Sequence, residues 1–271
     1  MIAIVVSTLA AASLVFSARW TWWRKRAPGL AVLCYHRIGI PPPGSGLKSL
    51  WVSPEKFRSQ IKYLADNGYK TLLFSEVSAA AASRAGLPEK AVLITFDDGY
   101  ENNYTEAWPV LREFGAKGNI FVVFNTVGKA NLWHNPATEP WINMATPEML
   151  DEMQKSGLVE IGSHAMSHTR LDSLEPENAA WEIRESKKQL EKLLGVKICA
   201  FAYPYGAGAD TPSLRGEVRK AGYSLDFSFT QGKTVWPWSA EEGPLKRLFI
   251  RGGDNNLDFL LHLTRGASRV F

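Results

Sequence analysis

Short apolar runs alternate with helix-like segments along almost the whole chain after residue 30. Runs typical of buried strands, rich in β-branched and aromatic residues, lie near residues 31–36, 69–74, 91–94, 119–124, 158–161, 199–203, 223–228 and 248–251. Helical spacing of apolar residues, helix caps or glycine stops mark segments at 54–67, 76–84, 105–114, 146–156, 176–194 and 257–264. Because strands and helices alternate in this way, the sequence predicts a parallel α/β fold.

Two adjacent carboxylates, Asp97 and Asp98, follow the predicted strand at 91–94. Burying two carboxylates side by side costs free energy unless a cation or a proton compensates their charge. One of the pair could bind a metal while the other works as a base. An Asx turn that caps the following helix explains Asp-Asp-Gly equally well. This stretch alone therefore leaves both interpretations open.

Two of the five histidines, His164 and His168, follow the predicted strand at 158–161. Their i, i+4 spacing places both imidazoles on one face of a helical turn, where they can reach one metal ion. A carboxylate from elsewhere would complete a facial set with open positions for water. The alternative is a pair of polar surface histidines.

All of these side chains stand at the predicted C-terminal ends of strands. His36 ends the first strand, the aspartates and His164 end later ones, and Pro204-Tyr205 follows the strand at 199–203. In a parallel barrel the active site forms at that end of the strands. We therefore expect one shared site.

Composition is that of an ordinary globular protein, with 45% hydrophobic and 21% charged residues among 271. One domain with a large core is the natural interpretation, and two small domains are the alternative. The net charge of +4 is spread along the chain, so we expect no nucleic-acid partner. The two cysteines, Cys34 and Cys199, lie in apolar runs and are expected to be free thiols.

The N-terminus differs from the rest of the chain. Residues 1–18 carry no charge, and Trp20, Trp22 and Trp23 lead into a basic cluster at 24–26. This pattern predicts a hydrophobic membrane anchor helix within residues 1–26 and a catalytic domain at 27–271, with the domain on the cytoplasmic side. The alternative is a signal sequence cleaved near residues 17–18, which would place the domain in the periplasm or outside the cell.

Three motifs in order resemble those of the polysaccharide deacetylases, also called the NodB-homology domain or carbohydrate esterase family four. They are Thr-Phe-Asp-Asp-Gly-Tyr at 95–100, Ser-His-Ala-Met-Ser-His at 163–168 and Phe-Ala-Tyr-Pro-Tyr-Gly at 201–206. The resemblance covers residues 31–265 and implies a distorted parallel (β/α) barrel of about seven strands. Tyr-His-Arg-Ile at 35–38 resembles the permuted branch of biofilm poly-N-acetylglucosamine deacetylases.

The resemblance also implies roles. Asp97 would be the general base, and Asp98, His164 and His168 would bind a divalent metal, zinc or else cobalt, nickel or manganese. A metal there would lower the pKa of a bound water towards neutrality. The backbone N–H of Tyr205 would stabilise the oxyanion.

The general acid and the residue that orients the base each have two candidates. Many family members take the acid from a Leu-x-His motif, which His262 resembles, but the permuted branch takes it from the first strand, which favours His36. The third motif has Ala202 where the family usually has an arginine that orients the base. Arg247 or Arg251 could replace it.

The expected function is metal-dependent removal of an N-acetyl group from an N-acetylhexosamine unit of a polysaccharide or lipid-linked sugar, giving acetate and an amine. The alternatives are a deformylase of a lipid-linked formamido sugar and a non-catalytic glycan-binding relic of the same fold. Any of Trp133, Trp141, Trp236 and Trp238 could stack on a sugar, although packing within loops explains each one as well. We expect His134 to be a surface residue. The oligomeric state has no signature in the sequence.

Overall fold

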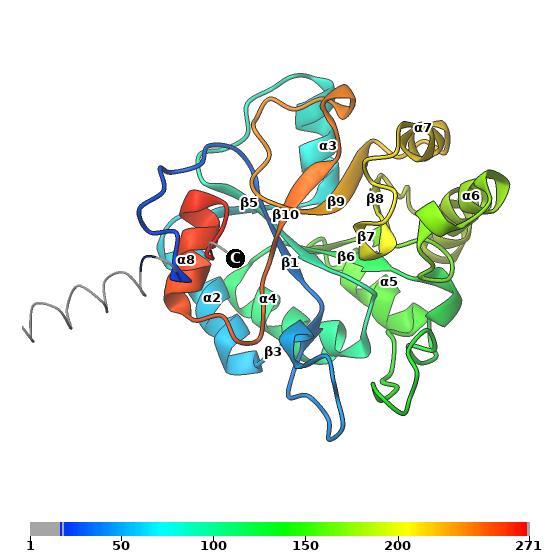
Figure 1. Ribbon diagram of the computed structural model, residues 1–271, viewed down its shortest axis with the longest axis horizontal. Helices are drawn as coiled ribbons and strands as arrows, with labels where there is room; N and C mark the ends of the chain where they lie inside the picture. The colour runs from blue at the N-terminus through cyan, green and yellow to red at the C-terminus, as the bar shows by residue number, and fades with distance from the viewer. Residues whose placement is uncertain (1–16, 18, 270–271) are drawn as a thin grey trace, which may run out of the picture.

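Seven parallel strands form a closed barrel at the centre of the computed structural model, which describes residues 17 and 19–269 (Figure 1). β1 pairs with both β5 and β10, which closes the ring in the order β1, β5, β6, β7, β8, β9, β10. The strands are β1 (Ala31–Tyr35), β5 (Ala91–Phe96), β6 (Gly118–Val122), β7 (Val159–Ser163), β8 (Ala200–Ala202), β9 (Leu225–Gln231) and β10 (Leu245–Phe249). The predicted α/β barrel of about seven strands is confirmed.

β4 (Lys70–Leu72) distorts this barrel because it shares one edge of β5 with β6. β4 pairs with the first half of β5, and β6 pairs with its second half. The buried side chain of Asn119 fills the junction: its Nδ2 donates to Leu72 O and Ile94 O, and its Oδ1 accepts from Phe74 N. These bonds satisfy the backbone groups that the change of partner would otherwise leave unpaired.

Helices surround the barrel, as Figure 1 shows. They are α2 (Pro54–Asp66), α3 (Phe74–Ala82), α4 (Trp108–Phe114), α5 (Pro147–Lys155), α6 (Pro176–Leu194), α7 (Pro212–Lys220) and α8 (Asn256–Arg265). Ser53 and Thr146 cap α2 and α5 as predicted, each accepting a backbone N–H three residues on. A short pair outside the barrel, β2 (Arg37–Ile38) and β3 (Trp51–Val52), follows β1.

Three elements differ from the sequence prediction. The strand predicted at 248–251 is β10, which begins earlier, at Leu245, because Arg247 is buried inside the barrel despite its charge. α7 was not predicted, since it buries little more than Leu214 and Val218 and contains a glycine. The helix after β5 begins with a π-helical turn, Asn103–Ala107, because Pro109 lacks an N–H and its ring crowds the preceding turn.

Alternation along the strands divides the core into two parts. Side chains such as Val32, Leu93 and Phe227 fill the barrel interior, and those between them, such as Leu33 and Ile94, pack outward against the helices. The same period-two pattern carries polar groups into the interior at the C-terminal end of the strands. That end of the barrel is therefore the polar one, and the site lies there.

Most of the N-terminal anchor predicted within residues 1–26, namely residues 1–16 and 18, lies outside the described residues. Of the described helices, none has the length and apolar character needed to cross a membrane. The first described residues pack beside α8, where Thr21 N donates to Ser268 O and Ala27 N donates to Thr264 O. Cys34 is buried and Cys199 is partly buried, and both are free thiols as predicted.

Candidate functional site

One cavity of about 310 Å³ opens at the C-terminal ends of the strands. Its walls contain all six residues that the sequence singled out: His36, Asp97, Asp98, His164, His168 and Tyr205. Leu47, Leu50, Trp133, His134, Phe229 and Phe249 complete the lining. Segments spread over more than 200 residues of sequence thus meet at one site.

Asp98 lies between the two histidines. Its Oδ1 is 3.5 Å from His164 Nε2 and 3.1 Å from His168 Nε2, and all three side chains are buried. The backbone of Asp98 is in the left-handed region, with φ 76°, which turns its side chain away from that of Asp97. The two adjacent carboxylates therefore face different partners.

A tight turn, rather than the predicted helical turn, carries His164 and His168. Ala165 and His168 both have positive φ, so the i, i+4 pair meets through backbone strain and not through helix geometry. Buried Glu182 of α6 holds the turn: its Oε2 accepts from Met166 N at 2.8 Å and Ser167 N at 3.0 Å. A carboxylate aimed at two backbone N–H groups stabilises this otherwise unfavourable conformation.

The donor set fits a divalent cation. His164 Nδ1 lies 2.8 Å from Ala202 O, so it carries the proton, and the lone pair on Nε2 faces Asp98. Burial lowers the pKa of His164 to about 4, so the ring is neutral at pH 7. Among the described residues, Asp98 Oδ1 has no hydrogen-bond partner. A lone pair that faces a carboxylate inside the protein is repulsive unless a cation lies between them, and two imidazoles with a carboxylate suit zinc.

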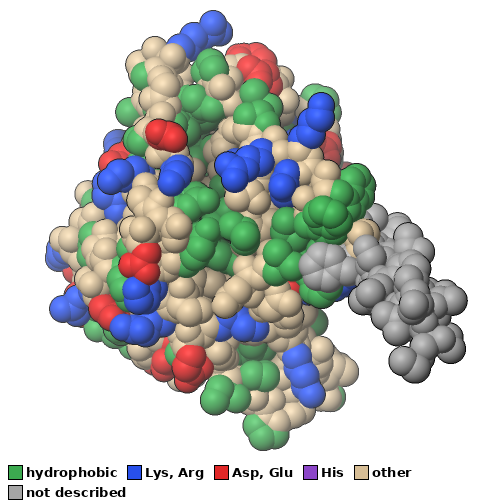
Figure 2. Space-filling view, turned by 90° about the vertical axis from the view of Figure 1, so that its left-hand side faces the viewer, with side chains coloured by type: hydrophobic (Ala, Val, Ile, Leu, Met, Phe, Trp, Pro, Cys, Tyr) green, Lys and Arg blue, Asp and Glu red, His purple; other side chains and the backbone are tan. Residues whose placement is uncertain are grey.

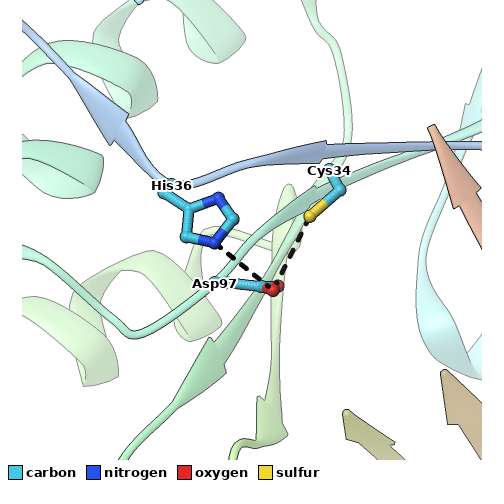
Figure 3. A group of neighbouring side chains, drawn as sticks. All are labelled: Cys34, His36 and Asp97. Carbon is cyan, nitrogen blue, oxygen red and sulfur yellow. Dashed lines mark hydrogen bonds and ion pairs between the residues drawn. The ribbon is translucent and has the colours of Figure 1, made fainter. Parts of the chain in front are cut away.

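Asp97 has a different environment. Arg247 Nη1 donates to Asp97 Oδ1 at 2.6 Å. Cys34 Sγ and His36 Nε2, drawn with Asp97 in Figure 3, lie 3.6 and 3.9 Å from Asp97 Oδ2. Burial opposes ionisation of Asp97, but the Arg247 guanidinium, together with His164 and His36, outweighs burial and holds the pKa of this carboxyl below its usual value. Asp97 is therefore an ionised carboxylate with one oxygen directed towards His36. Burial raises the pKa of the Cys34 thiol well above its usual value, so the thiol stays protonated.

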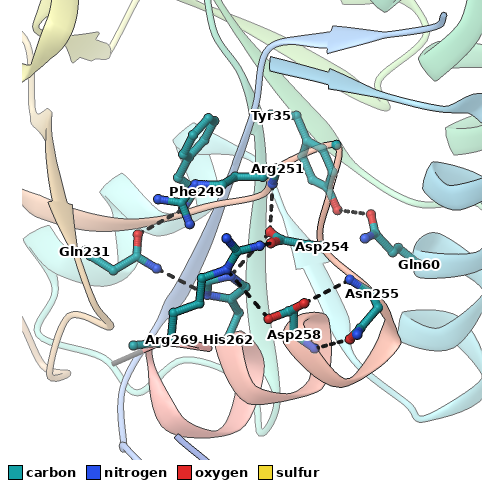
Figure 4. A network of polar contacts seen from close by, with 12 residues as sticks. Tyr35, Gln60, Gln231, Phe249, Arg251, Asp254, Asn255, Asp258, His262 and Arg269 are labelled. Carbon is teal, nitrogen blue, oxygen red and sulfur yellow. Dashed lines mark hydrogen bonds and ion pairs between the residues drawn. The ribbon is translucent and has the colours of Figure 1, made fainter. Parts of the chain in front are cut away.

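The two candidates for the general acid lie in different places. His36 lines the cavity, its ring packs edge-on against Phe229 and Phe249, and burial lowers its pKa. His262 is buried in α8, where Gln231 Nε2 lies 3.2 Å from its Nδ1 and Asp254 Oδ2 lies 3.6 Å from its Nε2 (Figure 4). It does not line the cavity, so position favours His36.

Tyr205 stands at the rim of the cavity. Its hydroxyl lies 3.1 Å from His168 Nδ1, and its backbone is left-handed, with φ 58°. The next residue has to be glycine, because a Cβ on Gly206 would lie 2.7 Å from Phe229 Cβ and its φ is 70°. The Pro-Tyr-Gly motif is thus a tight turn that brings Tyr205 over His168.

The four tryptophans separate in space. Trp133 stacks on His168 with ring centroids 4.4 Å apart, and exposed Trp141 donates from Nε1 to His134 O. Trp238 is part of the core, and Trp236 donates to Ala85 O away from the cavity. The prediction of a surface position for His134 is wrong, since the ring is half-buried and lines the cavity. Buried Arg37 holds it there, 3.3 Å away.

Of the two residues that support the site, Arg247 was a candidate from the sequence and Glu182 was not. Arg247 was one of two candidates to replace the missing arginine, and it is the one that contacts Asp97. Arg251 instead packs against Phe249, and its backbone N–H donates to Asp254. Glu182 was missed, because one more glutamate in a charged helix has no local signal. It lies on the buried face of α6 with Ala179, Ile183 and Ser186, where an apolar residue would be the usual expectation.

Comparison with known proteins gives consistent results. The family described as "Polysaccharide deacetylase" matches residues 84–225. The YxkH protein of Bacillus subtilis is 32% identical over 212 residues, which cover 78% of this chain and 68% of that protein. Poly-beta-1,6-N-acetyl-D-glucosamine N-deacetylase of Staphylococcus epidermidis is 28% identical over 239 residues, 80% of this chain and 78% of that one.

Solved structures agree with the sequence relatives. IcaB from Ammonifex degensii superposes with a TM-score of 0.70 at 27% identity, covering 89% of this chain and 97% of that one. The deacetylase PplD of Streptococcus pyogenes, in complex with acetate, has a TM-score of 0.70 at 25% identity and covers 83% and 94%.

Proposed function

Because this chain belongs to the polysaccharide deacetylase family and is a carbohydrate deacetylase, we propose that it removes N-acetyl groups from N-acetylglucosamine units of a β-1,6-linked polymer, giving acetate and a free amine. One observation carries the proposal. Asp97, paired with Arg247, stands beside a set of Asp98, His164 and His168 that fits a metal, and Asp97 and this set line one cavity. The staphylococcal relatives are named for deacetylation of poly-beta-1,6-N-acetyl-D-glucosamine, which suggests this polymer as the substrate.

A divalent metal held by Asp98, His164 and His168 would lower the pKa of water towards neutrality and polarise the amide carbonyl. Asp97 accepts the proton of the attacking water at Oδ2, because Oδ1 is occupied by Arg247. The Tyr205 backbone N–H would stabilise the oxyanion, as the turn at the cavity rim suggests; one such donor contributes about 3 kcal/mol to transition-state stabilisation.

His36 would supply the proton to the leaving amine. Its pKa is lowered, so the ring is neutral at pH 7 before substrate binds. The proton can come from Asp97, whose Oδ2 lies 3.9 Å from His36 Nε2. One proton would then pass from the water to Asp97, from Asp97 to His36 and from His36 to the leaving amine, so the net charge of the cavity would not change.

The test is acetate release from β-1,6-linked N-acetylglucosamine oligomers by the zinc- or cobalt-loaded protein. Asp97→Asn should abolish release and still bind metal, whereas Asp98→Asn should lose the metal as well. Full activity of Asp97→Asn would refute the assigned base. A wild-type protein that binds no metal and is indifferent to chelator would point to a glycan-binding relic.

Mass spectrometry with a panel of substrates tests the finer choice. Deacetylation replaces an acetyl group of the sugar by hydrogen and lowers its mass by about 42 Da, whereas deformylation lowers it by about 28 Da. The panel contains the oligomers, a polyprenyl-linked N-acetylglucosamine and a lipid-linked formamido sugar. Turnover of only the lipid-linked sugars would replace the polymer as substrate.

We also propose that residues 1–26 hold the domain at a membrane. The basic cluster at 24–26 follows Trp22 and Trp23, which are 47% and 54% exposed, and this pairing is typical of a membrane interface. Figure 2 shows one face of the described residues, on which hydrophobic patches have lysine and arginine side chains between them. Carbonate-washed membranes should retain the full chain and not a chain that lacks residues 1–26, and protease accessibility in vesicles would give the side.

A further inference from the structure

A buried ion pair joins three segments beside the cavity. Arg37, which directly follows His36, is fully buried and pairs through Nη1 with Glu139, which is 3% exposed. Glu139 also accepts from Ser45 Oγ and from Leu47 N, each at 3.0 Å. The start of β2, the loop before β3 and the long loop after β6 are therefore tied at one point.

The same arginine fixes the orientation of His134. Arg37 Nη2 donates to Tyr100 Oη at 2.8 Å and lies 3.3 Å from His134 Nε2. A guanidinium has only donors, so His134 Nε2 has to accept. The proton of the neutral ring is then on Nδ1.

The rest of the loop leaves that Nδ1–H available. Trp141 Nε1 donates to His134 O, and neighbouring Trp133 stacks on His168. His134 Nδ1 makes no hydrogen bond to any described residue, and it is not buried away from solvent. Because the ring lines the cavity, this N–H is a positioned donor at the wall of the site.

We propose that His134 is a substrate-binding residue whose Nδ1–H donates to a hydroxyl or carbonyl oxygen of the bound sugar, and that the buried Arg37–Glu139 pair sets its tautomer. The proposal rests on the proposed function, since it concerns the same cavity. A buried ion pair contributes little net stability but can specify one arrangement of the groups around it. Here the arrangement is a neutral imidazole with its donor directed at the ligand.

Two substitutions separate the ring nitrogens. In His134→Asn the side-chain amide occupies the place of Nδ1, and in His134→Gln it occupies the place of Nε2. With a β-1,6-linked N-acetylglucosamine tetramer we expect His134→Gln to raise KM about fivefold with kcat little changed, as the loss of one neutral hydrogen bond predicts. His134→Asn should restore most of the affinity. Leu132→Ala, an exposed position in the same loop, is the matched control and should leave KM unchanged.

Calorimetric binding of the same tetramer in the Asp97→Asn background separates this inference from the proposed function. If the wild type releases acetate and His134→Gln has the KM of the wild type, the inference is overturned and the function stands. If no acetate is released but His134→Gln weakens tetramer binding about fivefold, the inference stands and hydrolysis is overturned. If the tetramer binds to no variant, both are overturned. Equal loss of affinity in the Asn and Gln variants would reject Nδ1 as the donor.

Discussion

Arg247 donates from Nη1 to Asp97 Oδ1 over 2.6 Å, and both side chains are buried inside the barrel although 150 residues separate them. β1 lies between the strands that carry them, and the inward positions of β5 and β10 bring the two groups together at the polar end of the barrel. The guanidinium takes the position next to the base that the third motif, with Ala202, leaves without an arginine. This pair therefore sets the charge of the proposed base.

Removing the Arg247 cation should move the acid limb of the pH profile. Asp97 has a depressed pKa, so wild-type activity that depends on its carboxylate is lost only as pH falls through that low value. In Arg247→Met the pKa of Asp97 rises, and activity is lost at a higher pH. Arg247→Lys keeps the charge and should shift less. Profiles of kcat/KM against pH measure this.

The same change tests stability. Removing one partner of a buried ion pair typically costs about 3–5 kcal/mol, so Arg247→Met should unfold at lower denaturant concentration. Arg251→Met is the control, since Arg251 contacts Phe249 and not Asp97. An Arg251→Met variant with the shifted pH profile would contradict the assignment to Arg247.

His36→Gln should lower kcat for the N-acetyl substrate about 10²–10⁴-fold, because the leaving amine then has no acid. It should affect an aryl acetate much less, since a phenolate leaves without a proton. His262→Gln should keep kcat within a few-fold and lower the melting temperature, because His262 belongs to the polar network around α8. Kinetics on both substrates, with calorimetry, distinguish the two histidines. Equal losses of His36→Gln on amide and ester would argue against an acid.

Glu182→Ala should weaken metal binding about 10–100-fold, the usual effect of removing a group that orients the ligands. The turn between His164 and His168 would lose the carboxylate that accepts from Met166 N and Ser167 N. Competition with a chromogenic chelator gives the affinity. Glu185→Ala, one turn further along α6 and without contact to this histidine turn among the described residues, is the control and should bind metal like the wild type.

Gly206→Ala should destabilise the protein by about 2 kcal/mol and reduce activity, because the new Cβ needs a left-handed backbone and displaces Phe229, which packs on His36. Gly216→Ala in α7 is the opposite case. A Cβ there meets nothing within 4 Å, so helix propensity alone should stabilise the fold by about 0.5–1 kcal/mol. Urea unfolding measures the free energy of unfolding of both variants. A Gly206→Ala variant as stable as the wild type would contradict the tight turn.

Local sequence patterns were enough to predict most strands, their alternation with helices and the three motifs. Hydrophobic periodicity and turn residues determine secondary structure over only a few neighbouring residues. The same patterns were also enough to place Asp97, Asp98, His164 and His168 at the ends of strands. Their geometry was not local: the i, i+4 histidines meet through a turn with two left-handed residues, one of them His168, held by Glu182. No spacing rule contains that carboxylate.

Only the tertiary structure decided the contacts between segments that are distant in the sequence. Arg247 rather than Arg251 reaches Asp97, His36 rather than His262 lines the cavity, and Arg37 orients His134 across a long loop. Each choice depends on which buried charges lie within a few ångströms after the barrel closes, since electrostatic contacts depend on distance in space and not on separation along the chain. The sequence by itself determined which groups were available, and barrel closure decided which of them meet.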